Sequence, residues 1–224
     1  MLTLYYSPGA SSLVPHIALE EIGAPYERKS INLAAGEHKS AAYLKINLRG
    51  KVPALSIDGR VLTENVAILT YLAKRFPDAR LLPQDLLEES QCLSTMAWFA
   101  SAVHPTFAHI IRPERFASDT AAQLNMSNTA RQTFWAHCDE INGLLANNKW
   151  MMGAQYTVCD PYAFFFYDLG SRIKLPMREL AAYTAFNERM LQRSAVRRVR
   201  DLEEKSLEGS NAWQGPYFPD VRRG

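Results

Sequence analysis

Residues 51–65 read KVPALSIDGRVLTEN, and this stretch decides the fold of the first third of the chain. Two short apolar runs flank the Asp-Gly pair at 58–59, which favours a tight hairpin because glycine tolerates a positive φ angle. Glu64 and Asn65 then open a run of apolar side chains with helical spacing. The stretch therefore predicts a strand, a turn, a second strand and a helix. It also places a carboxylate and free backbone N–H groups beside the Val-Pro step, a corner suited to a small peptide-like ligand.

The sequence upstream of this stretch extends the pattern. Alternation and turn residues predict a strand over 2–6, a helix ending near 22, a second strand over 26–31 and a short helix over 39–46. The hydroxyls at 11 and 12 are expected to cap the first helix. The resulting order, βαβαββα over about 75 residues, is the thioredoxin-like order.

Downstream, the segment over 76–83 holds two prolines and no helical period, so we interpret it as a break. Beyond it the sequence contains helical patterns and no convincing strand. We therefore predict an α/β thioredoxin-like N-terminal domain (1–77), a linker (78–87) and an all-α C-terminal helical domain (88–224). The aromatic and proline-rich stretch at 213–219 is expected to be an extended segment that packs back on the protein.

The composition is that of an ordinary globular protein, and the net charge of +2 is too small to indicate a nucleic-acid surface. Arginines between 193 and 200 are followed by Asp201, Glu203 and Glu204, so we expect a solvated helix face there. No run approaches the roughly 18 apolar residues that span a bilayer, and the N-terminus lacks the features of a signal peptide. We therefore expect a cytoplasmic protein with neither nucleic acid nor a membrane as partner.

Three cysteines, Cys92, Cys138 and Cys159, lie far apart in the sequence and form no CxxC pair. Their number and spacing favour reduced thiols over a disulfide framework or a zinc site. The five histidines show no metal-ligand spacing. We therefore expect no bound metal.

The segment YYSPGASSLVPH at 5–16 resembles the N-terminal signature of the bacterial β-class glutathione transferases, and 51–65 resembles the glutathione-binding half of that family. The resemblance covers essentially the whole chain, with both domains in the family's order. It implies glutathione as co-substrate, a small electrophile as second substrate and a homodimer.

Ser11 stands where β-class enzymes typically carry a cysteine that can form a mixed disulfide with glutathione, and a serine cannot form that bond. In serine-type classes a serine at this place donates a hydrogen bond to the glutathione sulfur. A hydroxyl and helix N-terminal N–H groups would favour the thiolate, which is the nucleophilic form of a thiol with an ordinary pKa of about 8.5. We expect Ser11 to be the catalytic activator, with Ser12 and Tyr6 as alternatives. Taken alone, without the resemblance, Ser11 fits an ordinary helix cap better than an activator.

Val52 and Pro53 form the step before the hairpin. On local sequence alone they fit an ordinary proline at the start of a strand. Thioredoxin-like proteins keep a cis-proline here, so the resemblance implies a cis bond that turns the Val52 N–H and C=O toward the peptide backbone of glutathione.

The resemblance assigns further glutathione contacts to charged and polar side chains. Glu64 and Asn65 are expected to bind the γ-glutamyl group, while the alternative for this acidic helix start is simple capping. His38 and Lys39, with Lys51 as a further candidate, are expected to bind the glycyl carboxylate. The alternative for these residues is an exposed polar loop.

In the helical half, Thr157 and Asp160 form an expected capping box before a buried helix, with Cys159 as a core residue. His104 lies where β-class enzymes carry a histidine near the electrophile site, so the resemblance makes it a catalytic candidate. The alternative is a packed histidine beside aromatic side chains, and the following Pro105 is expected to kink the helix. Phe107, Ile111 and Phe164 are candidates for an apolar substrate pocket, and plain core packing is the alternative.

Three functions remain open at this point. The resemblance favours conjugation of the glutathione thiolate to small hydrophobic electrophiles. The alternatives are a glutathione-dependent isomerase, lyase or dehalogenase on the same scaffold, and a non-catalytic glutathione-binding or regulatory protein.

Overall fold

The computed structural model describes residues 1–208. These residues form two compact units, which are described separately below. The first unit comprises residues 1–82 and the described residues from 190 onward, and the helical unit comprises residues 83–189. The expected segment at 213–219 lies outside the described residues.

A four-stranded sheet forms the centre of the first unit, in the order β2-β1-β3-β4. The strands are β1 (Leu2–Tyr6), β2 (Tyr26–Ser30), β3 (Ala54–Ile57) and β4 (Arg60–Thr63). β1 pairs with β2 in parallel and with β3 antiparallel, and β3 pairs with β4 antiparallel. Both residues of the hairpin turn have positive φ, 49° at Asp58 and 85° at Gly59, as the Asp-Gly pair predicts.

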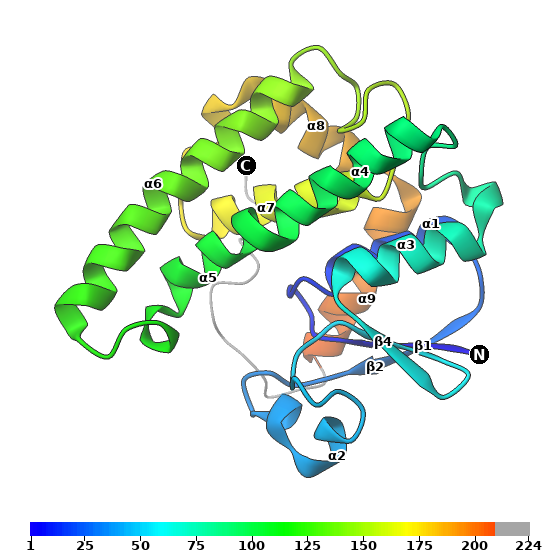
Figure 1. The fold of residues 1–224 in the computed structure, drawn as a ribbon, viewed down its shortest axis with the longest axis horizontal. Coiled ribbons are helices and arrows are strands. Elements are labelled where there is room, and N and C mark those ends of the chain that lie inside the picture. The colour runs from blue at the N-terminus through cyan, green and yellow to red at the C-terminus, as the bar shows by residue number, and fades with distance from the viewer. Residues whose placement is uncertain (209–224) are drawn as a thin grey trace. The chain divides into compact units, whose positions relative to one another are not determined.

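Helices of the first unit bury their apolar sides against this sheet. Figure 1 shows α1 and α3 side by side along one face of the sheet, with α2 beyond the other face. Leu4 and Leu55 of the sheet, Ile17 of α1 and Ile68 of α3 are fully buried between these elements. The helices are α1 (Leu13–Ile22), α2 (Ala41–Leu44), α3 (Asn65–Arg75) and α9 (Ser194–Glu208), with short 3-10 turns at Glu37–Lys39 and Pro77–Ala79. The βαβαββα order is confirmed.

The start of α1 differs from the expected cap. The Ser12 hydroxyl makes no capping bond to the helix; it accepts a hydrogen bond from the Ser7 N–H (3.0 Å) and donates to the Ser7 carbonyl (3.1 Å). Ser12 is fully buried and closes the loop between β1 and α1. The capping expectation was wrong because the hydroxyl has a nearer partner inside its own loop.

The last described helix, α9, packs against α1 and belongs to the first unit. Arg193 Nε lies 2.6 Å from Glu21 Oε1, and Arg198 Nε lies 2.8 Å from Glu20 Oε2. The described chain from 190 onward therefore groups with the sheet, whereas the sequence placed it with the helical domain.

The helical unit contains four helices within its limits and most of a fifth, α8. Their bounds are α4 (Leu86–Trp98), α5 (His104–Ile111), α6 (Thr120–Leu145), α7 (Cys159–Arg172) and α8 (Ala181–Gln192), with 3-10 turns at Pro113–Arg115 and Met177–Glu179. Figure 1 shows α6 running alongside α5. The buried aromatic rings of Phe99, Phe134 and Phe166 form the centre of this unit.

A π-helical turn over Phe99–Val103 joins α4 to α5, and the His104 N–H donates to the Phe99 carbonyl. Pro105 lies in the first turn of α5 and has no N–H to donate. The π-helical turn just before it has already shifted the backbone hydrogen bonds by one residue. The expected interruption at Pro105 is thus a widened turn within a continuous helical segment.

The start of α7 confirms the predicted capping box. Asp160 Oδ2 accepts from the Thr157 N–H (2.6 Å), and the Thr157 hydroxyl accepts from the Cys159 N–H (3.3 Å). Cys159 is fully buried, as expected of a core residue, and its Sγ lies 3.4 Å from that of Cys92. Burial raises the pKa of the Cys159 thiol well above its ordinary value.

Candidate functional site

The loop between β1 and α1 presents Ser11. Ser12 is committed to Ser7, whereas the Ser11 hydroxyl forms no hydrogen bond with any residue in the described part of the chain. Ser11 is almost buried, with 9% of its surface exposed, and it lies two residues before the first residue of α1. Of the two adjacent serines, Ser11 is therefore the one whose hydroxyl can donate to a ligand.

The N-terminus of α3 contacts this loop directly. Asn65 Nδ2 donates to the Ser11 carbonyl at 3.1 Å, and Asn65 is itself buried. Its Oδ1 atom is buried and has no hydrogen-bond partner among residues 1–208. The side chain thus fixes the peptide that carries Ser11 and leaves one acceptor oxygen beside it.

Glu64 has a strained backbone, with φ 70° and ψ 128°, and its side chain makes no capping bond to α3. The carboxylate is exposed, and its Oε1 lies 3.3 Å from Arg49 Nη1. Capping therefore does not account for this carboxylate. The Glu64 side chain is 64% exposed to solvent.

Val52 and Pro53 are joined by a cis peptide bond, as the resemblance implied. The preceding Lys51 carbonyl accepts two hydrogen bonds, from the Tyr43 hydroxyl (2.7 Å) and from Asn47 Nδ2 (2.8 Å). Burial raises the pKa of Tyr43 to about 12, so its hydroxyl remains a donor even in alkaline solution near pH 10. Both side chains hold the backbone in place just before the cis bond.

The strand register brings these segments to one edge of the sheet. Tyr5 at the carboxyl end of β1 lies opposite Ala54, and Ala54 lies opposite Thr63 at the end of β4. The residues that follow β1, precede β3 and follow β4 therefore emerge at the same edge. These are the Ser11 loop, the cis-proline and Glu64 with Asn65.

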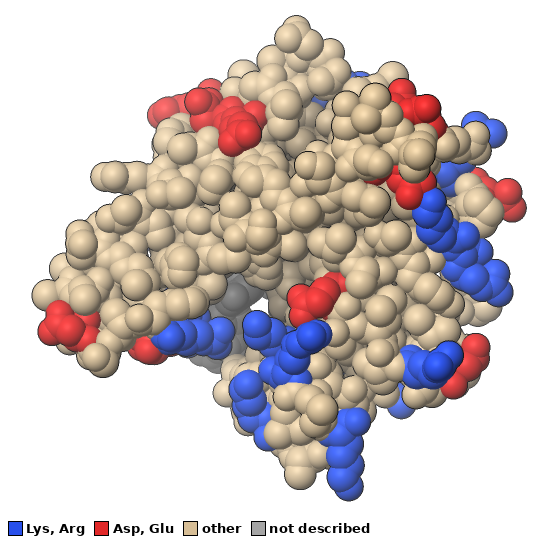
Figure 2. All heavy atoms as spheres, in the orientation of Figure 1, with Lys and Arg blue, Asp and Glu red and all other residues tan. Residues whose placement is uncertain are grey.

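His38 and Lys39 form a 3-10 turn that packs against Gly50. A Cβ atom at Gly50 would lie 2.7 Å from the His38 carbonyl oxygen, so only glycine allows this approach. Lys39 and Lys51 are exposed, and neither forms an ion pair with a described residue. Figure 2 shows Lys and Arg side chains gathered over the segment around α2, a surface of positive charge.

The Tyr6 hydroxyl, the other candidate activator, lies 2.6 Å from Ser206 Oγ on α9. Its ring is 3% exposed and stacks obliquely on His16, with ring centroids 5.1 Å apart. In this structure the Tyr6 side chain thus points toward α9.

The remaining candidates belong to the helical unit. The His104 ring contacts Phe165 edge-on, with centroids 5.8 Å apart. Phe107 packs on Phe134, and Phe164 is buried on α7. Ile111 lies one turn after Phe107 on α5 and is 38% exposed. Phe107 and Phe164 thus take part in core packing, and Ile111 has the most accessible side chain of the three pocket candidates.

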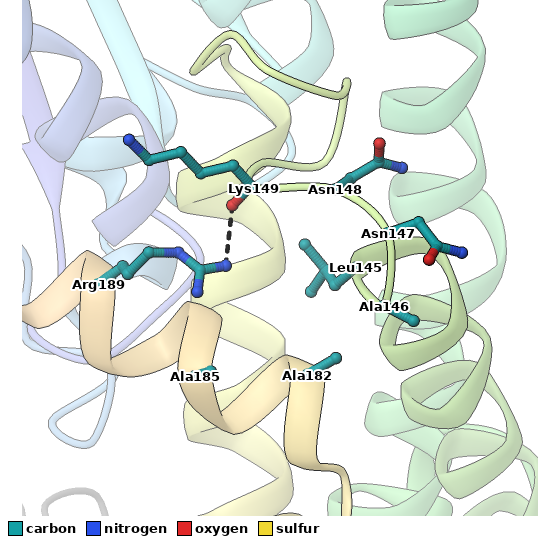
Figure 3. A pocket seen from close by; sticks show the side chains of 8 residues that line it. All are labelled: Leu145, Ala146, Asn147, Asn148, Lys149, Ala182, Ala185 and Arg189. Atoms are coloured by element: carbon teal, nitrogen blue, oxygen red, sulfur yellow. Dashed lines mark hydrogen bonds between the residues drawn. The ribbon is translucent and has the colours of Figure 1, made fainter.

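A pocket of about 430 Å³ lies in the helical unit between the end of α6, the following loop and α8 (Figure 3). Arg189 lines it and donates from Nη2 to the Lys149 carbonyl at 2.9 Å. None of the expected site residues lines it, so it is not the predicted site. Among residues 1–208 no group of three His, Cys, Asp or Glu side chains is arranged to hold a metal ion, and no helix there is long and apolar enough to cross a membrane.

Sequence reasoning missed Glu203, which was expected on a solvated face and is 1% exposed. Its Oε1 lies 3.0 Å from His16 Nδ1, and its Oε2 accepts from the Gly9 N–H at 2.8 Å. The signal that could have found it is helical phase, because Glu203 follows the buried Val196 and Val199 at spacings of seven and four residues.

Known proteins resemble this chain over most of its length. Residues 1–74 match the family described as "Glutathione S-transferase, N-terminal domain". The chain is 32% identical to "Glutathione S-transferase GstA" of Escherichia coli O157:H7 over 90% of its own length and 98% of that protein. It is 37% identical to the maleylacetoacetate isomerase of Pseudomonas aeruginosa over 45% of its length and 49% of that protein.

The solved structure of a glutathione transferase homologue from Sulfitobacter, with bound glutathione, has a TM-score of 0.86 to this chain. The two are 32% identical, and the match covers 90% of this chain and 98% of the other. This chain is therefore similar to glutathione transferases in sequence and in structure over about 90% of its length, which includes the cis-proline and the Ser11 loop. The chain belongs to the glutathione S-transferase family.

Proposed function

We propose that this protein conjugates the glutathione thiolate to small hydrophobic electrophiles, with Ser11 as the residue that stabilises the thiolate. The observation that carries the proposal is the Ser11 hydroxyl, which has no described partner on a loop fixed through Asn65 and Ser12. A hydroxyl donor and the nearby N-terminus of α1 favour S⁻ over SH and lower the thiol pKa. The thiolate then attacks an electrophilic carbon, and a leaving group departs or an activated double bond is saturated.

The peptide part of glutathione is proposed to lie along the cis-proline edge. The Val52 backbone would pair with the cysteinyl unit as in an added strand. The Glu64 carboxylate would bind the γ-glutamyl ammonium, and the buried Asn65 oxygen offers that ammonium a second acceptor. The N-terminal N–H groups of the eleven-residue α3 would bind the γ-glutamyl carboxylate.

The glycyl carboxylate would lie against the basic surface. Lys39 and Lys51 are exposed cations without described acidic partners, and the His38 turn is held beside them by Gly50. Exposed cations contribute little free energy to binding an anion in water, so they orient the ligand more than they increase its affinity.

The electrophile is proposed to contact the helical unit through His104, Phe107, Ile111 and Phe164. Ile111 supplies exposed apolar surface on α5, whereas Phe107 and Phe164 are buried. We further propose that the protein acts as a homodimer in the cytoplasm.

A glutathione-dependent isomerase, lyase or dehalogenase is the second candidate, favoured by the match to the maleylacetoacetate isomerase. Its chemistry would begin with the same thiolate, so it requires the same Ser11 site. A non-catalytic glutathione-binding protein is the third candidate, and it would show binding without turnover.

The test is the ultraviolet thiolate absorbance of bound glutathione, measured against pH for the wild type, Ser11→Ala and Tyr6→Phe. Ser11→Ala is expected to raise the bound thiol pKa by about one unit or more, equivalent to about 1.4 kcal/mol. Tyr6→Phe, which removes a hydroxyl that contacts Ser206, is expected to leave it within about 0.3 unit.

A wild type that binds glutathione with an unperturbed thiol pKa would favour the non-catalytic binder. A shift in Tyr6→Phe rather than in Ser11→Ala would move the activating role to Tyr6. Absence of glutathione binding would overturn the proposal as a whole.

A further inference from the structure

Glu203 is a buried carboxylate that ties α9 to the segment carrying Ser11. One of its oxygens contacts His16 Nδ1 on α1, and the other accepts from the Gly9 N–H in the loop before α1. Both Glu203 and His16 are excluded from solvent, at 1% and 0% exposure. The two contacts join three segments that are distant in the sequence.

A carboxylate is costly to remove from water, and it remains buried only when its partners are held in place. His16 has no polar alternative, because its Nε2 is buried without a partner among the described residues. The rings of Tyr6 and Tyr26 pack on the imidazole, 5.1 and 6.0 Å away between centroids. The Glu203 side chain and its two partners are therefore fixed together.

The loop that presents Ser11 is consequently anchored on two sides. Asn65 on α3 holds the Ser11 carbonyl, and Glu203 on α9 holds the Gly9 N–H two residues earlier. The Ser12 hydroxyl closes the loop internally on Ser7. A loop fixed at these points has little freedom to move the Ser11 hydroxyl, and a hydrogen bond to a thiolate is sensitive to such displacement.

We propose that Glu203 is a positioning residue for thiolate activation, which acts through the Gly9–Ser11 backbone and His16 and touches no substrate itself. The inference rests on the proposed function of Ser11. It assigns to α9, at the far end of the described chain, control over the geometry of a site formed by the first 65 residues.

The experiment compares the bound glutathione thiol pKa in Glu203→Ala, Glu203→Asp and Glu203→Gln. Glu203→Ala removes both contacts, and Glu203→Asp keeps the charge but is one methylene too short to reach both partners. Each is expected to raise the thiol pKa by about one unit, a tenfold loss of thiolate at a given pH. Glutathione affinity, measured by calorimetry below that pKa, is expected to change by less than about threefold. Glu203→Gln can still accept from the Gly9 N–H, so its bound thiol pKa is expected to stay within about 0.3 unit of the wild-type value.

Two control variants on α9 separate positioning from general loosening. Asp201→Ala removes an exposed carboxylate from the same helix and is expected to change nothing. Arg198→Ala breaks the pair with Glu20 and weakens the contact of α9 with α1 without touching the loop. Its melting temperature is expected to fall while its bound thiol pKa stays at the wild-type value.

The proposal is overturned if Glu203→Ala and Glu203→Asp bind glutathione with the wild-type thiol pKa, or if Arg198→Ala shifts that pKa as far at an equal loss of melting temperature. A Gln variant as impaired as the Ala variant would also overturn it. If Glu203→Ala does not fold, the Asp and Gln variants decide. A wild type that fails to lower the thiol pKa refutes the function of Ser11 instead, so the two failures are distinguishable.

Discussion

The backbone of Glu64 has a positive φ angle, a conformation that residues other than glycine rarely adopt. We predict that Glu64→Gly is more stable than Glu64→Ala by about 1–2 kcal/mol, because glycine relieves the strain that alanine keeps. Both variants lose the carboxylate and are expected to bind glutathione more weakly than the wild type. Chemical denaturation and calorimetric titration measure the two effects. Equal stabilities of the two variants would show that the backbone stores no strain here.

Gly50 provides a second prediction at the same scale. Gly50→Ala is expected to cost about 2–3 kcal/mol, because its Cβ meets the His38 carbonyl at 2.7 Å and its φ is positive. Gly36→Ala is the matched control: its φ is +75° but nothing lies within 4 Å, so only the backbone cost of about 1 kcal/mol is expected. Thermal unfolding measures both. A Gly36 variant as unstable as the Gly50 variant would contradict the role given to the clash.

Single residues also show where sequence reasoning succeeds and where it fails. The cis bond at Pro53 was implied by the resemblance and is present. Ser12 was expected to cap α1, but its hydroxyl forms hydrogen bonds with the Ser7 backbone instead. These bonds depend on the path of the loop from Ser7 to Ser12, which the sequence does not specify. Glu203 was expected in solvent because neighbouring charges concealed its helical phase. Helical phase could have indicated its burial, but its partners, 187 and 194 residues away, are brought to it only by the fold.

At the scale of elements, the capping box makes α7 dependent on one carboxylate. Asp160 is fully buried and accepts from the Thr157 N–H and the Met151 N–H, the latter at 2.8 Å. Asp160→Ala is expected to cost about 3 kcal/mol or more, because two buried donors lose their acceptor. Asp119→Ala removes the exposed cap of α6, which accepts from the Ala122 N–H, and is expected to cost about 1 kcal/mol. Urea unfolding compares them, and similar losses would contradict the importance of burial.

Elements with local chemical signals were predictable, and elements defined by distant packing were not. The hairpin of β3 and β4 follows from its Asp-Gly turn, and α1 ends at Gly23, whose φ is 72°, as the sequence indicates. The π-helical turn before Pro105 was expected only as a kink, because the sequence does not say how the chain accommodates a missing N–H. A helix was expected over the residues of α9, but its contact with α1 was not.

At the scale of the whole molecule, the packing of α9 on α1 places the last described helix in the first unit and not in the helical unit. Residues from 190 onward group with the sheet of the first unit, so this unit is built from both ends of the described chain. The order of segments along a sequence carries no such information. A fragment ending near residue 82 would lack α9, and with it the acceptor for Gly9 and the partner of His16.

Alkaline pH is expected to destabilise the whole molecule through groups that folding keeps protonated. Burial raises the pKa of the Cys138 thiol from 9.0 to about 12. The folded pKa exceeds the unfolded one, so this contribution to stability is fully present below pH 9 and is lost as pH rises toward 12. In that window each such group lowers the unfolding free energy by about 1.4 kcal/mol per pH unit. Tyr43 behaves in the same way above its ordinary value of 10.0.

Cys138→Ala is therefore predicted to lose stability less steeply than the wild type between pH 9 and pH 10. The slopes of unfolding free energy against pH are expected to differ by about 1.4 kcal/mol per pH unit, the value for one proton. At pH 7 the variant is expected to be less stable by about 1 kcal/mol, because the buried sulfur is replaced by a smaller group. Urea unfolding in the presence of a reductant, at several pH values from 7 to 11, yields both quantities. Parallel pH profiles for the two proteins would mean that the Cys138 thiol ionises as readily in the folded state as in the unfolded chain, contrary to its complete burial on α6.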